Sequence, residues 1–124
     1  MAKKAKILLA DDEEDIKTVI SLYLGAKGYE VVTAYDGLDA IDKAKTEKPD
    51  LILLDVMMPI MNGFEVCQKL KDDPDTQDIP IIMLSAAAQS ETITKSIELG
   101  AKDYIVKPFD PERLDKMIFK YLDK

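Results

Sequence analysis

Four short apolar runs along the chain each end on a polar residue, and this repeated pattern constrains the fold more than any other feature. The runs span residues 6–10, 51–54, 80–84 and 104–106. The polar residues that follow them are Asp11 and Asp12, Asp55, Ser85, and Lys107. Short apolar runs bounded by turn residues are typical of strands buried on both faces, as in a parallel sheet. Ligands of an open α/β sheet bind beyond the carboxyl ends of its strands, so we expect these polar groups to gather at one edge.

Helical patterns separate the predicted strands. Apolar residues recur at helical spacing after the first strand, and Gly28 predicts the end of that helix. Asp36 is placed to cap a second helix, and the pattern predicts a third over Met61–Lys71. Asp110 followed by Pro111 is typical of a helix start and predicts the last helix. The predicted strands cover residues 6–10, 29–34, 50–55, 80–85 and 102–106.

The alternation of strands and helices predicts an α/β fold. Connections between parallel strands are right-handed, so successive helices cover both faces of one sheet. We expect a doubly wound, five-stranded parallel sheet in strand order 2-1-3-4-5. Its switch point would lie between the first and third strands. Asp11, Asp12 and Asp55 follow or end those two strands.

Composition limits the classes of function. A chain of 124 residues, 47% of them hydrophobic, suffices for one domain over residues 1–124 with a core of its own. The formal charge of −7 and the single arginine, Arg113, argue against direct binding of nucleic acid. No apolar run approaches the roughly 18 residues that cross a membrane. The single Cys67 cannot form an internal disulfide, and we expect a reducing, cytoplasmic location.

Three carboxylates at one sheet edge repel one another unless a cation or a proton lies between them. Mg²⁺ meets this need, because it binds few carboxylates and also accepts phosphate oxygens. Zinc is a poor fit, since the chain has no histidine and Cys67 lies within a predicted helix. Asp55 is the expected nucleophile, because carboxylates can form aspartyl phosphates. Lys107 would supply positive charge to the phosphoryl oxygens, and Ser85 a hydroxyl donor.

These residues lie in motifs that resemble the receiver domains of two-component response regulators, the CheY-like family. The resemblance covers nearly the whole chain and is specific, because five segments occur in the family's order. The segments are Leu9-Ala-Asp-Asp-Glu13, Leu54-Asp-Val-Met-Met-Pro-Ile-Met-Asn-Gly63, Met83-Leu-Ser-Ala86, Gly100-Ala-Lys-Asp-Tyr104 and Val106-Lys-Pro-Phe109. The resemblance implies a flavodoxin-like (βα)5 fold and a phosphorylation-controlled signalling switch. Such a protein is a phosphoacceptor that catalyses its own phosphorylation and dephosphorylation, and not an enzyme acting on other molecules.

The resemblance also implies roles by position. Asp55 would accept the phosphoryl group from a histidine kinase or a phosphotransfer protein. Asp12, Asp55 and the backbone carbonyl of Met57 would bind Mg²⁺ directly, and Asp11 would act mainly through water. Ala87 is small and would leave a path for the water that hydrolyses the aspartyl phosphate.

Further roles concern the transmission of the signal. Ser85 and Lys107 would contact the phosphoryl oxygens, and Lys107-Pro108 would be a cis peptide. Tyr104 would turn inward as Ser85 moves to the phosphate, which would change the face formed by the fourth helix, fifth strand and fifth helix. That face would control an unknown output protein or domain, or pair two copies of the chain. The chain departs from the family at two positions, with Ser85 where threonine is commoner and Asn62 where aspartate is common. These departures would alter the rates of the reaction and would leave the activity itself in place.

Three other functions fit parts of the pattern. A small-molecule phosphatase or phosphotransferase that uses an aspartyl phosphate commonly has a second acid two residues after the nucleophile, where this chain has Met57. A nucleotide- or flavin-binding protein would share the fold, but the acids Asp11-Asp12-Glu13-Glu14 would repel phosphate unless a metal were bound. A degenerate receiver used only for docking would lack part of the site, and here the set of residues is complete.

The same residues also have purely structural explanations. Asp11 and Asp12 are placed to cap the first helix, where acids favour the helix dipole. Packing of an edge strand beneath a helix explains Tyr104 as well as a switch does. The acidic segment 72–78 lacks the ligand spacing of a calcium-binding EF-hand loop and is predicted to be a solvated loop.

Overall fold

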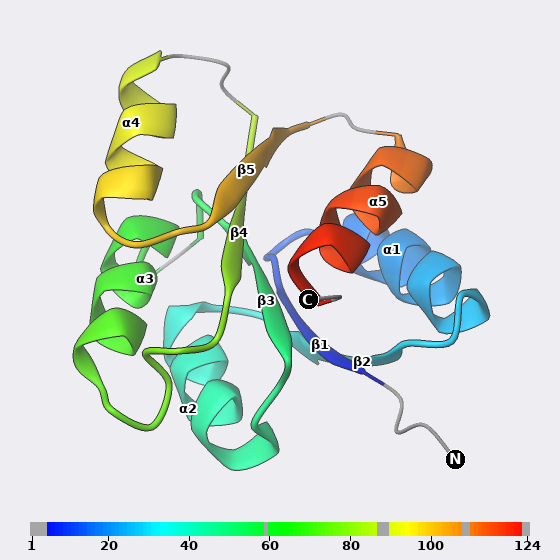
Figure 1. Ribbon diagram of the computed structural model, residues 1–124, viewed down its shortest axis with the longest axis horizontal. Coiled ribbons are helices and arrows are strands. Elements are labelled where there is room, and N and C mark those ends of the chain that lie inside the picture. Colours follow the sequence, from blue (N-terminus) through cyan, green and yellow to red (C-terminus); the bar gives the residue numbers. More distant parts are fainter. Residues whose placement is uncertain (1–4, 59, 87–89, 108–109, 123–124) are drawn as a thin grey trace.

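The computed structural model describes residues 5–58, 60–86, 90–107 and 110–122, and in these ranges five strands alternate with five helices (Figure 1). The strands are β1 (Lys6–Ala10), β2 (Glu30–Ala34), β3 (Leu51–Asp55), β4 (Ile81–Ser85) and β5 (Asp103–Val106). The helices are α1 (Glu14–Ala26), α2 (Gly37–Glu47), α3 (Gly63–Asp72), α4 (Ser90–Glu98) and α5 (Pro111–Leu122). The predicted alternation is confirmed, and the predicted strand ends move by a single residue at most.

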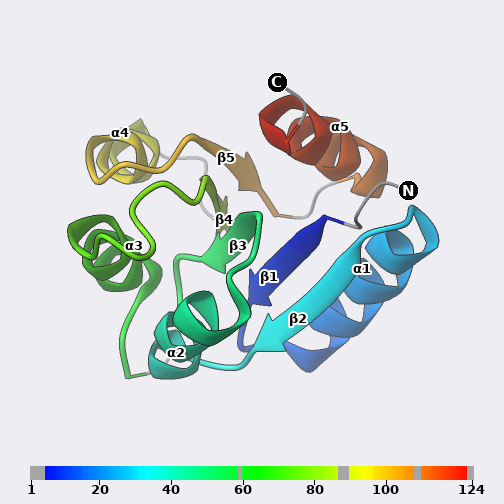
Figure 2. The ribbon, with the colours of Figure 1, turned by 60° about the horizontal axis from the view of Figure 1, so that its bottom comes forward.

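The strands form one parallel sheet in the order β2-β1-β3-β4-β5, which confirms the predicted topology. Figure 2 shows α1 and α5 on one face of the sheet and α2, α3 and α4 on the other. Because helices cover both faces, β3 and β4 are buried along their whole length. The switch point lies between β1 and β3, as expected.

The core has two halves, one on each face of the sheet. Successive side chains of a strand point to opposite faces, so Leu8 of β1 belongs to one half and Ile7 to the other. The first half includes Cys67 of α3, which is fully buried. The second half includes Leu24 of α1 and Leu114 of α5. In the described part of the chain, no helix is both long and apolar enough to span a bilayer.

Side-chain caps set the starts of two helices. The Asn62 side chain accepts the Glu65 N–H at 3.0 Å, and the Glu65 carboxylate accepts the Asn62 N–H at 3.2 Å. This reciprocal pair is a capping box. It begins α3 at Gly63, so the predicted start at Met61 was two residues early. Asp36 caps α2 as predicted, accepting the N–H three residues further on at 2.8 Å.

The acidic segment 72–78 is not wholly solvated, which corrects the prediction. Thr76 within it has no exposed surface, and its hydroxyl donates to the Leu70 carbonyl at 2.6 Å. The Lys71 ammonium donates to the carbonyls of Gln77 and Ile79 at 3.0 and 3.1 Å. These bonds fold the segment back against the end of α3.

Candidate functional site

The three predicted acidic residues meet at the carboxyl edge of the sheet. Asp11 and Asp12 follow β1, Asp55 ends β3, and these strands are neighbours. One carboxylate oxygen from each residue lies within 4.8 Å of the others. Asp11 has no exposed surface and Asp55 is 3% exposed, whereas Asp12 is exposed. The cluster therefore combines two buried carboxylates with one that solvent can reach.

Lys107 brings a positive charge to this cluster from the far end of the chain. Its side chain is mostly buried, and Nζ lies 2.9 Å from Asp11 Oδ2 and 3.4 Å from Asp55 Oδ2. Its backbone N–H donates at 2.7 Å to the carbonyl of Ser85, the last residue of β4. The predicted meeting of a lysine with the acidic residues is therefore observed.

Sequence reasoning missed one member of this ion-pair network. Glu13 Oε1 lies 3.2 Å from Lys107 Nζ. Asp11 Oδ1 accepts the backbone N–H of Glu13 at 2.9 Å, which fixes the turn that precedes α1. In the sequence, Glu13 stands out only as one of four consecutive acids that would repel phosphate. Its pairing with a lysine 94 residues away depends on the folded geometry.

Burial and crowded charges shift the pKa values of the site. Burial, followed by the charge of Asp11, raises the pKa of Asp55 to about 7, because these effects outweigh Lys107 and the N–H of Met57. Burial also disfavours the charged form of Lys107. The hydrogen bond to Asp11 and the charges of Asp55 and Asp11 nevertheless leave the pKa of Lys107 above its ordinary value. Asp55 therefore retains a proton up to about neutral pH when no other cation compensates it.

The chain that follows Asp55 passes very close to the end of β3. A Cβ atom on Gly63 would lie 2.8 Å from Val56 Cα and still closer to the Asp55 carbonyl oxygen. The Gly63 N–H donates to the Val56 carbonyl at 2.8 Å. The Met57 N–H donates to Asp55 Oδ1 at 3.3 Å. Only glycine fits this approach, and it holds the loop that carries Met57 beside Asp55.

Ser85 and Tyr104 lie on the neighbouring strands β4 and β5. Ser85 ends β4 one residue beyond Leu84, the register partner of Asp55, and is 5% exposed. Tyr104 pairs with Met83 and is half-buried against the core half that contains Met83. This arrangement agrees with the packing explanation of Tyr104. Two further predicted features, the Lys107-Pro108 cis peptide and the small side chain of Ala87, fall on residues outside the described ranges.

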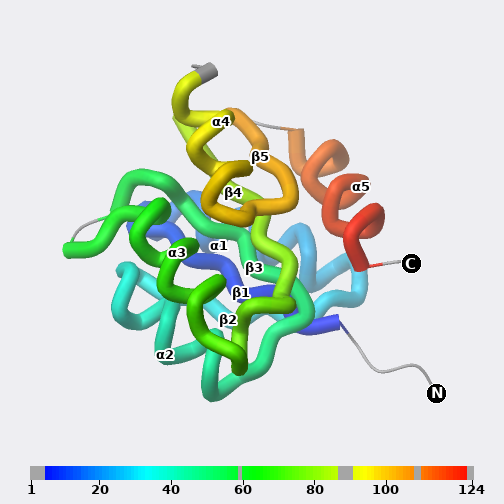
Figure 3. Tube along the Cα trace, turned by 60° about the vertical axis from the view of Figure 1, so that its left-hand side comes forward, coloured from blue at the N-terminus to red at the C-terminus, as the bar shows by residue number. Residues whose placement is uncertain are grey.

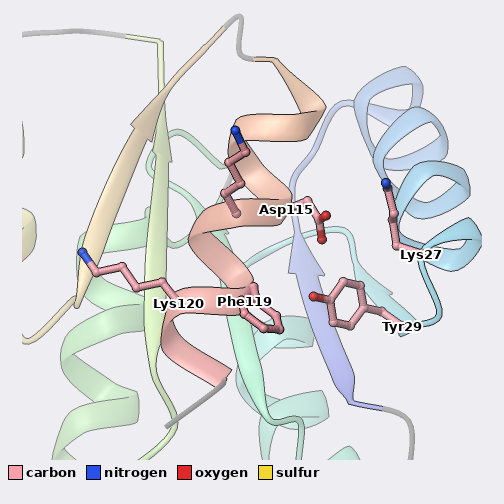
Figure 4. A pocket seen from close by; sticks show the side chains of 6 residues that line it. Lys27, Tyr29, Asp115, Phe119 and Lys120 are labelled. Carbon is pink, nitrogen blue, oxygen red and sulfur yellow. The ribbon is translucent and has the colours of Figure 1, made fainter.

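Two hollows of similar volume lie on the α1–α5 side at opposite ends of the strands. The hollow at the site has a volume of about 510 Å³, and Glu13 and Lys107 line it together with Ile16, Val19, Ile20 and Pro111. The other has a volume of about 490 Å³ and is shown in Figure 4, where Asp115 and Tyr29 point toward one another beside Phe119. Burial, followed by Asp115, raises the pKa of Tyr29 there. Among the described residues, only the first hollow shares residues with the network around the acidic cluster.

A family model described as the response regulator receiver domain matches residues 7–119 of the chain. The chain belongs to the response regulator receiver domain family. Receiver domains are the phosphorylation-controlled signalling domains of two-component response regulators, and they work with histidine kinases and output domains. The family assignment confirms the resemblance noted in the sequence motifs.

Several curated relatives of this receiver domain are named as transcriptional regulators. The chain is 47% identical over 115 residues to the probable transcriptional regulator ycf27 of Cyanophora paradoxa, covering 93% of this chain and 47% of the relative. It is 46% identical over 113 residues to the alkaline phosphatase synthesis transcriptional regulatory protein PhoP of Bacillus subtilis, covering 91% and 46%. The chain thus spans about half the length of these relatives.

Solved receiver domains share the fold closely. The chemotaxis protein CheY4 of Vibrio cholerae superposes with a TM-score of 0.92 at 38% identity, covering 97% of this chain and 100% of that one. The receiver domain of the sensor histidine kinase PA1611 from Pseudomonas aeruginosa gives a TM-score of 0.91 at 28% identity, covering 98% and 100%. That structure holds a magnesium ion in its active site cleft.

Proposed function

We propose that residues 1–124 form one receiver domain that accepts a phosphoryl group on Asp55 and binds Mg²⁺ beside it. The observation that carries this proposal is the meeting of Asp11, Asp12 and Asp55 within 4.8 Å, with Lys107 Nζ against two of them. A buried nucleophile, an acidic metal site and a fixed ammonium group are the parts that phosphoryl transfer to a carboxylate requires.

The donor set fits a hard divalent cation. Asp12, Asp55 and the Met57 backbone carbonyl would hold Mg²⁺, and Asp11 would act mainly through water. Support comes from the oxygen-only ligands, which Mg²⁺ prefers, and from the exposed Asp12. Burial and then the charge of Asp11 raise the pKa of Asp55, and a cation beside Asp55 would favour its charged form. When bound, the ion would neutralise charge on the transferring phosphoryl group.

In the proposed reaction, a carboxylate oxygen of Asp55 attacks the phosphorus of a phosphohistidine. The new O–P bond forms as the P–N bond breaks, and the electron pair of that bond returns to the imidazole nitrogen. Lys107 and Ser85 would donate to the phosphoryl oxygens. Attack of water on phosphorus later releases inorganic phosphate and restores the Asp55 carboxylate. The domain would therefore catalyse both its own phosphorylation and its own dephosphorylation.

The proposed switch begins at Ser85. A phosphoryl oxygen would draw its hydroxyl into a charge-assisted hydrogen bond, and Tyr104 of the adjacent strand would turn inward to fill the vacated space. The face formed by α4, β5 and α5 would then change. Figure 3 shows α4 beside β5, and Lys95 of α4 lies 4.6 Å from the ring centre of Phe64 on α3. Exposed residues of this face that would contact a partner are Lys95, Ile97, Lys102 and Arg113.

The proposed partners follow from the family. A histidine kinase or a phosphotransfer protein would supply the phosphoryl group, and an output protein or domain would read the changed face. A second copy of the chain could pair through the same α4-β5-α5 face. The net charge of −7 supports action without direct contact to nucleic acid. The single Cys67, which cannot form an internal disulfide, supports a location in the reducing cytoplasm.

Incubation with a small acyl phosphate, with and without Mg²⁺, tests this function by intact mass. The wild-type chain should gain one phosphoryl group only when Mg²⁺ is present. Asp55→Asn should gain none, whereas Asp42→Asn, at an exposed acid on α2, should behave as wild type. Uptake by Asp55→Asn at the wild-type rate would contradict the proposal.

A further inference from the structure

The Lys107 ammonium faces three carboxylates at once. Its Nζ lies 2.9 Å from Asp11 Oδ2, 3.2 Å from Glu13 Oε1 and 3.4 Å from Asp55 Oδ2. Lysine has three donors and no acceptor, and Lys107 donates to Asp11 and Glu13 while it forms an ion pair with Asp55. Asp11 and Asp55 belong to the acidic cluster, whereas the Glu13 side chain is 58% exposed and lies outside that cluster. Of these three carboxylates, Glu13 is therefore the one that does not belong to the proposed metal site.

The turn before α1 holds Glu13 in this position. Asp11 uses one oxygen for the Glu13 N–H at 2.9 Å and the other for Lys107. Glu13 is the N-cap residue of α1 and has an extended backbone, with φ −91° and ψ 112°. Its side chain makes no capping hydrogen bond to the helix. The Glu13 carboxylate is therefore directed to Lys107 instead of the helix terminus.

We propose that Glu13 is a positioning residue that receives the Lys107 ammonium when the acidic cluster takes a divalent cation. The inference rests on the proposed function, because it concerns the same metal site. Lys107 must then weaken its contacts to Asp11 and Asp55, since two cations compete for the same oxygens. A mostly buried ammonium without a partner is costly. Glu13 supplies that partner and keeps Lys107 within reach of the phosphoryl group.

A consequence is that loss of the Glu13 charge should weaken Mg²⁺ binding through Lys107. Asp15→Asn is the matched control, because Asp15 carries the same charge in the first turn of α1 and forms no ion pair within the described ranges. Glu14 is unsuitable as a control, because it pairs at 2.7 Å with Lys17, whose side chain is buried. Lys107→Gln provides the background in which the Glu13 contact no longer exists.

The experiment is a titration of metal-free protein with Mg²⁺, followed by backbone amide chemical shifts. Glu13→Gln should raise the Kd about 2- to 5-fold, the range expected for one partly exposed ion pair. Asp15→Asn should change it less than about 1.5-fold, because solvent and salt screen a more distant charge. In the Lys107→Gln background, Glu13→Gln should have no larger effect than Asp15→Asn. Before Mg²⁺ is added, Glu13→Gln but not Asp15→Asn should shift the Lys107 Cε resonance.

Equal Kd values for Glu13→Gln and Asp15→Asn would overturn the inference. A Glu13→Gln effect that persists in the Lys107→Gln background would overturn it too. In both cases binding of Mg²⁺ by the wild-type chain would leave the proposed metal site intact. Absence of Mg²⁺ binding by the wild-type chain would overturn the metal site and this inference together.

Discussion

Replacement of Gly63 by alanine should destabilise the fold and displace the loop that follows Asp55. The added Cβ would lie 2.8 Å from Val56 Cα and 3.0 Å from the Asp55 carbonyl carbon. These are backbone atoms at the end of a central strand, so they must move by roughly 1 Å to restore ordinary van der Waals contact. Overpacking costs about 1–3 kcal/mol. We expect a loss of about 2–3 kcal/mol, at the upper end of that range, because no flexible side chain can give way.

Equilibrium unfolding by urea measures this loss, and Gly25→Ala is the matched control. A Cβ on Gly25, near the end of α1, would have no neighbour within 4 Å. Alanine there should stabilise the protein by up to about 1 kcal/mol, because alanine has the higher helix propensity. The two substitutions should therefore have opposite signs. A Gly63→Ala protein within about 0.5 kcal/mol of wild type would refute the steric argument, because surface substitutions commonly fall in that range.

Four further outcomes are expected. The pKa of Asp55 is about 7 in the folded chain and near 4 in an unfolded one, so folding takes up a proton, and the free energy of unfolding without metal should fall from about pH 4 to pH 7. Chemical unfolding across this window should show a flatter pH profile of that free energy for Asp55→Asn than for wild type, and identical profiles would contradict the raised pKa. Asn62→Ala should lose about 1 kcal/mol in urea unfolding through loss of the α3 cap, whereas Asn62→Asp should not; equal losses would exclude the cap. Mg²⁺ should raise the wild-type Tm by binding the folded state, and calorimetry should find a smaller rise in Asp12→Ala; an undiminished rise would remove Asp12 from the metal site. Phosphorylated Ser85→Ala should show smaller chemical-shift changes at Tyr104 than wild type, and equal changes would exclude the Ser85–Tyr104 coupling.

The sequence predicts the sheet well because its strands are buried on both faces. Continuous apolar runs such as 51–54 leave little choice of strand position, and the polar residue at each end marks the functional edge. The predicted start of α3 at Met61 was wrong, although the sequence contains the signal for the correct start. Asn62 followed three residues later by Glu65 is the sequence signature of a capping box, and it places the helix start at Gly63.

The remaining differences depend on side-chain direction, which neither spacing nor residue type determines. Glu13 reaches Lys107 only because Asp11 fixes the turn before α1 and the Lys107 side chain extends to it from the end of β5. Thr76 is buried because its hydroxyl finds the Leu70 carbonyl at the end of α3. Both contacts are made by polar side chains in segments whose polar composition predicts exposure to solvent.

The position of the phosphoryl group tests the central claim most directly. The chain would be phosphorylated by an acyl phosphate with Mg²⁺, the aspartyl phosphate reduced with borohydride, and the resulting homoserine located by tandem mass spectrometry of peptides. Homoserine at position 55 alone is the predicted result. Homoserine at Asp11 or Asp12, with Asp55 unmodified, would contradict the assignment of Asp55 as the phosphoacceptor.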